Sequence, residues 1–376
     1  MRHLVLLGGG HAHLHVLRAL ARQAVPGVRV TLVSPFSHLV YSGMLPGLVA
    51  GHYAHSDCAI PLDLLAADAG ADWDEAAALG MDAQHRRIYL SSGDELGYDV
   101  LSIDVGSVMD RNTIAGASEH GLFVRPIERF ASKLDSLLLL ANKQALSLVV
   151  VGGGAAGTEI ALALQHRLGA RSRVSLVTGG APPLSSYPTP VQQLARQLLR
   201  RGNISVFEDA CVEVAADRVT FGSGMRLACD APVLAINGCA PSWLLGSGLL
   251  LDDNGYVAVS ATLQSSSHPE VFAAGDVASR IDAPHPKSGV YAVRAGPPLA
   301  RNLRRFMMGS PLQAYLPQQR SLNLLSCGGR RAIVSWGSFA AAGAWAWYLK
   351  NHIDRRFVAR FSKTSKVARV ELDAQQ

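Results

Sequence analysis

The sequence predicts an α/β protein in which one unit occurs twice: a buried strand, a glycine turn, a helix and a second strand. Both copies begin with a short apolar run that ends in three glycines, at Gly8–Gly10 and at Gly152–Gly154. In both, apolar residues at helical spacing follow, and then a further β-branched run. The length of 376 residues also exceeds what one core usually holds, which favours two domains.

The first unit starts with Leu4–Leu7, a short apolar run typical of a buried parallel strand. Apolar positions from Leu14 to Leu20 predict a helix, and Val28–Val33 is expected to be the next strand. A strand, glycine turn, helix and strand within about 30 residues are the context of the dinucleotide fingerprint G-x-G-x-x-G. Gly8 and Gly10 fill its first two glycine positions, but His13 stands at the third.

The second unit has the complete fingerprint. Leu148–Val151 leads into Gly152, Gly154 and Gly157, and Arg173–Val177 supplies the second strand. In such a turn the first glycine makes the tight bend, the second lets the backbone approach a pyrophosphate, and the third allows close helix–strand packing. Two copies in the right context predict two nested Rossmann-like dinucleotide-binding domains plus a C-terminal cap.

The acidic residue that usually binds the ribose hydroxyls is missing from both units. Ser34 follows the second strand of the first unit and Thr178 that of the second. Neither side chain offers a carboxylate for NAD, and no arginine stands there for a 2′-phosphate. The choice between NADH and NADPH therefore stays open at this stage.

Composition excludes several other classes. The hydrophobic fraction of 49% and the charged fraction of 17% exclude a disordered protein. The formal charge of +6 is too small to indicate nucleic-acid binding. Five cysteines without a CxxC pair suit a reducing compartment. The apolar run near the N-terminus is too short for a signal peptide, so a cytoplasmic location is expected, with the inner face of the membrane as an alternative.

Further along the chain, Val271–Val277 predicts a strand that ends in Ala274-Gly275-Asp276, followed by a helix over Gly289–Met307. Together with the two fingerprints, this order resembles the pyridine nucleotide-disulfide oxidoreductase superfamily of two-dinucleotide flavoproteins. The resemblance implies FAD in the first unit, with Asp276 on the ribityl chain, and NAD(P)H in the second. Residues 104–106 and 237–241 look like the crossover strands between the two domains.

Within the superfamily the chain is most similar to the single-subunit NADH dehydrogenase-like branch, in a subgroup also found fused to selenophosphate synthase. The segments that carry this resemblance are residues 8–13, 41–47 and 286–294. Disulfide reductases of the superfamily have a cysteine pair at the match to Tyr41–Gly47, where this sequence has none. A redox-active dithiol is therefore not expected.

The resemblance and the fingerprints together predict the site residues. Glu159 and Lys287 are the catalytic candidates: Glu159 near the nicotinamide and flavin edge, and Lys287 as a cation at the pyrimidine end of the flavin. Arg125 is a weaker candidate for the same pocket. The predicted cofactor-binding residues are Gly8, Gly10, His11, Ala12, Ser34, Pro35, Met44, Leu45, Gly106, Gly152, Gly154, Ala155, Gly157, Glu159, Thr178, Gly238, Gly275, Asp276, Lys287 and Val290.

Other features have plainer interpretations. No metal site is predicted, because His11, His13 and His15 are expected in a polar loop and on an exposed helix face. Asp276 could alternatively cap a helix, and Glu159 could simply complement a helix dipole. Cys327 is expected to be a packing residue.

The C-terminal region predicts a contact surface rather than a membrane span. Ala332–Leu349 has no charged residue, but it is rich in alanine, and residues 332–337 favour a strand and turn. Phe339–Phe361 is expected to form a helix carrying Trp345, Trp347 and Tyr348. A basic run follows from Lys350 to Arg369, and aromatic residues beside basic ones are typical of interfacial membrane binding through residues 339–369. A helix packed on the flavin domain or a homodimer contact are the alternatives.

These observations predict four segments: residues 1–110 and 256–320 as a split FAD domain, 111–255 as the inserted NAD(P) domain, and 321–376 as the cap. The expected activity is hydride transfer from NAD(P)H to FAD and electron transfer to a quinone or similar acceptor. One alternative is oxidation of a sulfide or selenide species, which would need Cys239 or Cys327. The others are a flavoprotein linked to selenophosphate synthesis and a non-catalytic FAD-binding module.

Overall fold

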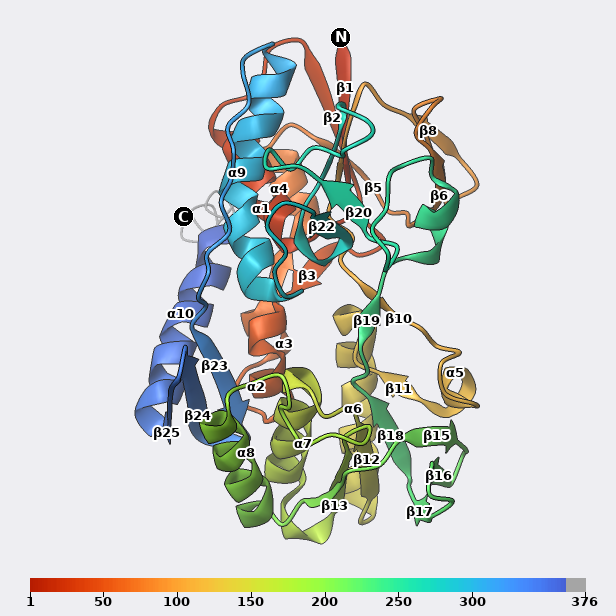
Figure 1. Cartoon of the computed structure of the whole chain (residues 1–376), viewed down its shortest axis with the longest axis vertical. Helices are drawn as coiled ribbons and strands as arrows, with labels where there is room; N and C mark the ends of the chain where they lie inside the picture. Colours follow the sequence, from red (N-terminus) through yellow and green to blue (C-terminus); the bar gives the residue numbers. More distant parts are fainter. Residues whose placement is uncertain (363–376) are drawn as a thin grey trace, which may run out of the picture.

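The computed structural model of the chain describes residues 1–362 (Figure 1). Two halves, each built on a parallel sheet, lie one above the other, and a C-terminal unit runs along one side of both (Figure 1). The predicted α/β fold class is confirmed.

The upper half contains a five-stranded parallel sheet in the order β21-β9-β1-β2-β5. Helices from the first unit and from the end of the chain share an apolar core on one face. The predicted strands at residues 4–7 and 28–33 and the predicted helix over Gly289–Met307 are confirmed. The elements are β1 (Arg2–Leu7), β2 (Val28–Val33), β5 (Asp72–Asp74), β9 (Val100–Ile103), β21 (Val271–Ala273), α1 (His11–Arg22), α4 (Leu62–Asp68) and α9 (Gly289–Met307).

Small elements cover the opposite face and one end of this sheet. A separate apolar core joins the antiparallel β6–β8 sheet to the upper sheet. These elements are β3 (His38–Val40), β4 (Ala59–Pro61), β6 (Ala78–Asp82), β7 (Arg87–Leu90), β8 (Glu95–Gly97), β20 (Val257–Val259), β22 (Ala278–Arg280), η1 (Ser42–Met44), η3 (Ser242–Gly246), η4 (Gly275–Val277), α2 (Leu45–Val49) and α3 (His55–Cys58).

The lower half contains a second five-stranded parallel sheet, in the order β11-β18-β12-β13-β14. The predicted strands at residues 148–151 and 173–177 are confirmed. The elements are β11 (Leu122–Phe123), β12 (Ser147–Val151), β13 (Arg173–Val177), β14 (Ser205–Phe207), β15 (Cys211–Val214), β16 (Arg218–Phe221), β17 (Arg226–Ala228), β18 (Ala231–Leu234), α5 (Ala117–His120), α6 (Ile127–Lys143), α7 (Ala155–Leu168), η2 (Gly169–Arg171) and α8 (Thr189–Arg201).

The chain passes between the halves twice. β10 (Val108–Met109) and β19 (Gly238–Cys239) make these crossings and pair antiparallel with each other. The crossing predicted at residues 237–241 is confirmed. The other crossing is predicted at residues 104–106, but its paired strand, β10, begins two residues later, at Val108.

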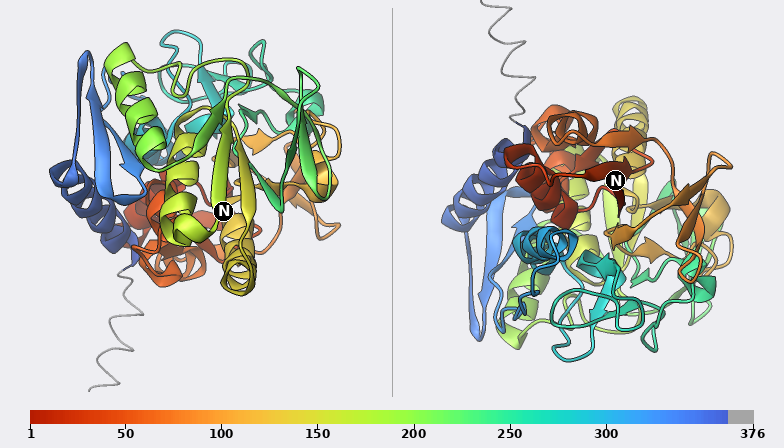
Figure 2. Two further views of the ribbon diagram at one scale, coloured as in Figure 1. Left: turned by 90° about the horizontal axis from the view of Figure 1, so that it is seen from below. Right: turned by 90° about the horizontal axis from the view of Figure 1, so that it is seen from above.

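The C-terminal unit consists of β23 (Asn323–Cys327), β24 (Gly329–Trp336), β25 (Phe339–Gly343) and α10 (Ala344–Ser362). Its sheet packs on α7 and α8 of the lower half, while α10 also contacts β4 and η1 of the upper half. The prediction of a helix from Phe339 is wrong at its start, because Phe339–Gly343 pairs with β24 as a strand. Seen from above, α1, α9 and α10 lie on one side of the molecule (Figure 2).

Two parts of the predicted aromatic and basic surface are also corrected. Trp347 is buried, and it stacks on Tyr53 with ring centroids 6.5 Å apart. Lys350 is buried beside Asp354 instead of belonging to an exposed basic run. Lys363, Lys366 and Arg369 of that run lie outside the described residues. No helix within residues 1–362 has both the length and the hydropathy needed to cross a membrane.

Candidate functional site

Three neighbouring strands of the upper sheet end at one level, because Leu7 and Ala273 both pair with Ile103. Gly8 and Asp104, which follow two of these strands directly, and Gly275, two residues after the third, therefore meet at the carboxyl edge of the sheet. A Cβ on Gly8 would lie 2.5 Å from the carbonyl oxygen of Asp104, and one on Gly275 would lie 2.5 Å from its Oδ1. Both glycines also have positive φ angles, so this edge requires glycine twice over.

Asp104 is a buried carboxylate under the N-terminus of α1. Its Oδ2 accepts the N–H group of Ala12 at 2.7 Å and that of His13 at 3.0 Å, and the His13 N–H also donates to the Gly10 carbonyl oxygen at 3.1 Å. Burial raises the pKa of Asp104 to about 7, although these hydrogen bonds act in the opposite direction. Asp104 is not among the site residues predicted from the sequence, although an acidic side chain directly after a fully buried strand is a signal for such a residue.

The histidines of α1 are not exposed, contrary to the prediction. His13, at the third glycine position, is fully buried: Nδ1 lies 2.6 Å from the Gly8 carbonyl oxygen and Nε2 lies 2.9 Å from Ser102 Oγ. Burial lowers the pKa values of His11 and His13 to about 4, so both rings are neutral at pH 7. His13 is buried because it lies on the face of α1 that packs against the core, together with Ala12 and Val16.

The ends of the first two strands are close to each other. Ser34 is buried, and its Oγ donates to the Phe36 carbonyl oxygen at 3.0 Å, which stabilises the turn through the exposed Pro35. The same Oγ lies 3.2 Å from where a Gly9 Cβ would be. Ser34 therefore shapes the turn beside the first fingerprint and does not project a free polar group.

The segment after β3 is anchored by α10. Lys350 Nζ donates to the Gly43 carbonyl oxygen at 2.6 Å, and Tyr41 stacks on Phe357 with ring centroids 4.5 Å apart. The side chains of Met44 and Leu45 are buried in the two cores. Because these side chains are used in packing, residues 41–47 could contact a ligand mainly through their backbone.

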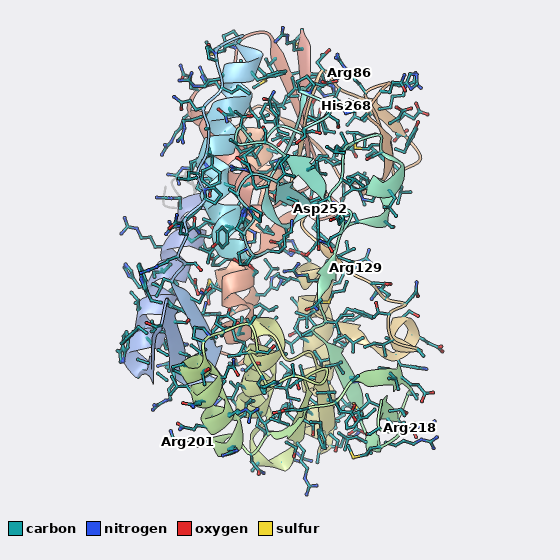
Figure 3. The ribbon with its side chains drawn as sticks, in the orientation of Figure 1. Arg86, Arg129, Arg201, Arg218, Asp252 and His268 are labelled. Carbon is teal, nitrogen blue, oxygen red and sulfur yellow. The ribbon has the colours of Figure 1, made fainter. Side chains whose placement is uncertain are left out.

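Charged groups meet where the two halves face each other. Asp276 Oδ2 lies 3.3 Å from Nη1 of Arg125, which also donates to Ser107 Oγ. Arg125 precedes α6 of the lower half, so this ion pair joins the two halves. Arg129 lies where the two halves meet, and Asp252 lies higher, in the upper half (Figure 3).

Lys287 and Asp276 line the same small pocket of the upper half. Its Nζ donates to the Ala278 carbonyl oxygen and lies 3.9 Å from the centroid of the Tyr256 ring. Desolvation lowers its pKa, against the charges of Asp252 and Asp276. Val290, in the first turn of α9, is half-buried.

Gly106 and Gly238 lie at the start of the two crossings. Gly106 has a φ of +70° with nothing near its Cβ position, and a Cβ on Gly238 would lie 2.5 Å from Ser107 Oγ. The Gly238 carbonyl oxygen accepts the hydroxyl of Tyr256 at 3.1 Å. The two crossings are thereby held together at the junction of the halves.

The second fingerprint separates glycines that the fold requires from one that it does not. A Cβ on Gly152 would lie 2.2 Å from the Ala235 carbonyl oxygen, and one on Gly157 would lie 1.9 Å from that of Gly152. Gly154 has no neighbouring atom within 4 Å of its Cβ position and an ordinary φ of −74°. Packing explains Gly152 and Gly157, whereas the space beside the Cβ position of Gly154 is open. Ala155, the first residue of α7, follows Gly154.

Glu159, one turn further along α7, contacts the C-terminal unit. Its Oε1 accepts the Ser326 N–H at 2.6 Å. Burial raises its pKa to about 7, and the charge of Lys350 acts against this shift. Thr178, at the end of β13, has its hydroxyl on the backbone carbonyls of Ala181 and Phe207.

Comparison with known proteins identifies the family of this chain. The sequence model of the family described as pyridine nucleotide-disulphide oxidoreductase matches residues 2–296. The chain belongs to this family. It is an oxidoreductase of the NADH dehydrogenase-like branch, and this membership makes it a flavoprotein.

Individual relatives agree with this oxidoreductase assignment, and a solved structure shares the fold. A demethylphylloquinone reductase of Synechocystis is 26% identical over 74% of this chain and 72% of its own. An NADH dehydrogenase-like protein of Mycobacterium tuberculosis is 30% identical over 80% of this chain and 78% of its own. NDH2 of Plasmodium falciparum in complex with NADH superposes with a TM-score of 0.78 at 13% identity, over 96% of this chain and 99% of that one.

The cysteines of this oxidoreductase are free, and none of the five forms a disulfide. Cys327 is buried next to Ser326, and burial raises the pKa of its thiol to about 12. Cys239 is partly exposed on β19, with its Sγ 3.5 Å from the Val108 carbonyl oxygen. The Cys327 thiol therefore stays protonated at neutral pH and is a poor nucleophile.

Proposed function

We propose that the chain binds FAD at the carboxyl edge of the upper sheet, oxidises NAD(P)H bound at the lower sheet, and passes the electrons to a quinone. The open space at Gly154 carries this proposal, because the fold gives no reason for a glycine there. The domain division at residues 1–110, 111–255, 256–320 and 321–376 belongs to the same proposal. The quinone is inferred from the printed function of the Synechocystis relative.

The residues at the upper edge fit FAD. Asp104 takes the N–H groups of Ala12 and His13, so those of Gly9 and His11 remain without a partner within residues 1–362. These two N–H groups could bind the pyrophosphate, because the N-terminus of α1 also favours negative charge. Bound FAD supplies the redox chemistry. Asp276 would orient its ribityl chain, and Arg125 would hold Asp276 in place.

The lower edge fits the pyrophosphate of NAD(P)H. Gly152 and Gly157 shape the turn, Gly154 leaves room above it, and α7 begins at Ala155 with its N–H groups toward that space. Because Thr178 uses its hydroxyl on the backbone, it offers the ribose no strong hydrogen bond. We therefore infer that discrimination between NADH and NADPH comes from other residues.

Anaerobic titration of the purified protein with NADH and then NADPH tests this function. The oxidised flavin bands in the visible spectrum are expected to bleach with at least one of them, and a quinone should restore the bands. A protein that contains no flavin after incubation with FAD would contradict the proposal at the upper edge. Bound flavin that neither nucleotide bleaches would contradict it at the lower edge.

Glu159 is proposed to deliver a proton to the acceptor. Quinone reduction takes up protons, and a carboxyl with a pKa of about 7 is protonated below pH 7 and ionised above it. The quinone-reduction rate should therefore fall as the pH rises through 7. In Glu159→Gln, whose side-chain oxygen can still accept the Ser326 N–H, this fall should be absent from the rate profile. A variant with an unchanged pH profile would show that Glu159 serves only to pack the cap on α7.

Sulfide or selenide oxidation is disfavoured by the cysteines. It needs a reactive thiol at Cys239 or Cys327. The Cys327 thiol is buried and protonated, and the Tyr41–Gly47 segment contains no cysteine, so only the partly exposed Cys239 is left for this chemistry. Alkylation of the free thiols should leave quinone reduction unchanged.

The proposed function includes contact with a membrane surface through α10. Trp345 and Tyr348 are 54% and 57% exposed on this helix, in the manner of interfacial aromatic residues. A quinone dissolved in the lipid would reach the molecule from this side.

A further inference from the structure

A groove of about 480 Å³ lies between α1 and α9, on the side of the molecule where α10 ends. Five arginines line it: Arg18 and Arg22 from α1, Arg301 and Arg304 from α9, and Arg360 from α10. Its floor is apolar and includes Leu4, Leu20 and Leu303. It lies beside β1 and the two helices, away from the carboxyl edge where Gly8 and Gly275 meet.

Among residues 1–362, no aspartate or glutamate lines the groove, and neither α1 nor α9 contains one. Five guanidinium groups over a low-dielectric floor produce a positive potential that attracts anions. His15 also lines the groove, and its pKa is consistent with this positive potential. Burial, and then the charges of Arg360 and Arg18, lower the pKa of His15 to about 4.

Arg18 and Arg304 use their guanidinium groups in hydrogen bonds within the fold, whereas those of Arg22, Arg301 and Arg360 have no hydrogen-bond or ion-pair partner among residues 1–362. Arg18 Nη1 donates to the Arg360 carbonyl oxygen at 2.9 Å, and Arg304 Nη1 donates to that of Gln23 at 2.8 Å. Arg22 and Arg301 are exposed and make no hydrogen bond or ion pair with residues 1–362. Their guanidinium groups could therefore bind an oxyanion in a bidentate manner.

The exposed face of α10 connects the groove to the aromatic surface. Trp345, Leu349, Ile353, Arg356 and Arg360 are exposed at the spacing of one helical face. The face is therefore apolar in its first half and basic in its second, and it ends at the groove. An amphiphile with a negative head matches this order, since aromatic residues suit the acyl boundary and arginines suit the headgroups.

We propose that this groove binds the phosphate group of an anionic phospholipid, so that the protein lies on the membrane with α10 and the α1–α9 face toward it. The proposal rests on the membrane contact of the proposed function and adds the headgroup chemistry and the residues that recognise it. Arg22 and Arg301 are the specific phosphate ligands.

The test measures flotation of the purified full chain with vesicles of phosphatidylcholine alone or mixed with phosphatidylglycerol. The wild type should prefer the anionic vesicles, and Arg22→Gln/Arg301→Gln should weaken that binding about 30-fold, the effect of two juxtamembrane arginines. The matched control is Arg173→Gln/Arg226→Gln, which removes the same charge from β13 and β17 at the opposite end of the molecule (Figure 1). This control should change the binding by less than about threefold.

Three outcomes would overturn the proposal: equal binding of the wild type to both vesicles, equal losses in the two arginine variants, or displacement by inorganic phosphate at constant ionic strength. The last would assign the groove to a free phosphate compound. Trp345→Ser/Tyr348→Ser separates the proposal from the function beneath it. If this variant alone loses binding to both vesicles, α10 is the contact and the groove is not. If it binds normally while the groove variant does not, the contact proposed through α10 is wrong and the groove stands.

Discussion

A protein with Gly154→Asp is expected to keep its fold and its flavin but to oxidise NADH at least about 100-fold more slowly, equivalent to ~2.7 kcal/mol in kcat/KM. Gly154 is the N-cap of α7, with φ −74° and ψ −172°, a conformation that any residue can adopt. No atom lies within 4 Å of its Cβ position. Because aspartate is a favoured N-cap, the helix should lose no stability. The new carboxylate would fill the space above the turn and repel the pyrophosphate.

The measurements are the melting temperature, the visible spectrum, and the bleaching of that spectrum by NADH under anaerobic conditions. Gly157→Ala is the contrasting variant, because its Cβ would lie 1.9 Å from the Gly152 carbonyl oxygen and should lower the melting temperature. Wild-type bleaching in Gly154→Asp would show that the nicotinamide nucleotide binds elsewhere. A large loss of stability would mean that the glycine serves the fold.

Lys350→Met is expected to lower the free energy of unfolding by about 3–5 kcal/mol, the usual effect of leaving one member of a buried ion pair alone. Lys350 and Asp354 are 8% and 4% exposed, and Nζ lies 2.7 Å from Asp354 Oδ2. Nζ also donates to the Gly43 carbonyl oxygen. The substitution therefore leaves the buried carboxylate of Asp354 and the carbonyl group of Gly43 without their donor. Since Gly43 lies in the segment expected beside the flavin, the variant should also retain less FAD.

Chemical denaturation and the ratio of flavin to protein absorbance measure the two effects. Lys350→Met/Asp354→Leu removes both charges and should recover most of the lost stability. Because it does not restore the donor to Gly43, its flavin content should stay low. Recovery of both would show that Lys350 acts only on stability and does not position the segment at Gly43.

The sequence by itself determined the elements whose signals are local. Glycine turns between a buried run and a helical pattern predicted both βαβ units, since such patterns depend only on neighbours along the chain. The same holds for α9, whose predicted range Gly289–Met307 is confirmed. The sequence-based prediction is wrong at Phe339–Gly343. An alanine-rich segment favours a helix by itself, but here the neighbouring strand β24 supplies hydrogen-bond partners and the segment becomes a strand. The predicted site residues without a test remain predictions.

Only the tertiary structure decided which distant groups meet. Asp104 lies under α1 because β9 pairs with β1, Arg125 reaches Asp276 because the halves face each other, and Glu159 reaches Ser326 because the cap packs on α7. The burial of His13 and Lys350 has the same origin. From the sequence alone, a charged or polar residue is expected to be exposed. Whether it is buried depends on its packing partners, because burial requires that they supply matching hydrogen bonds.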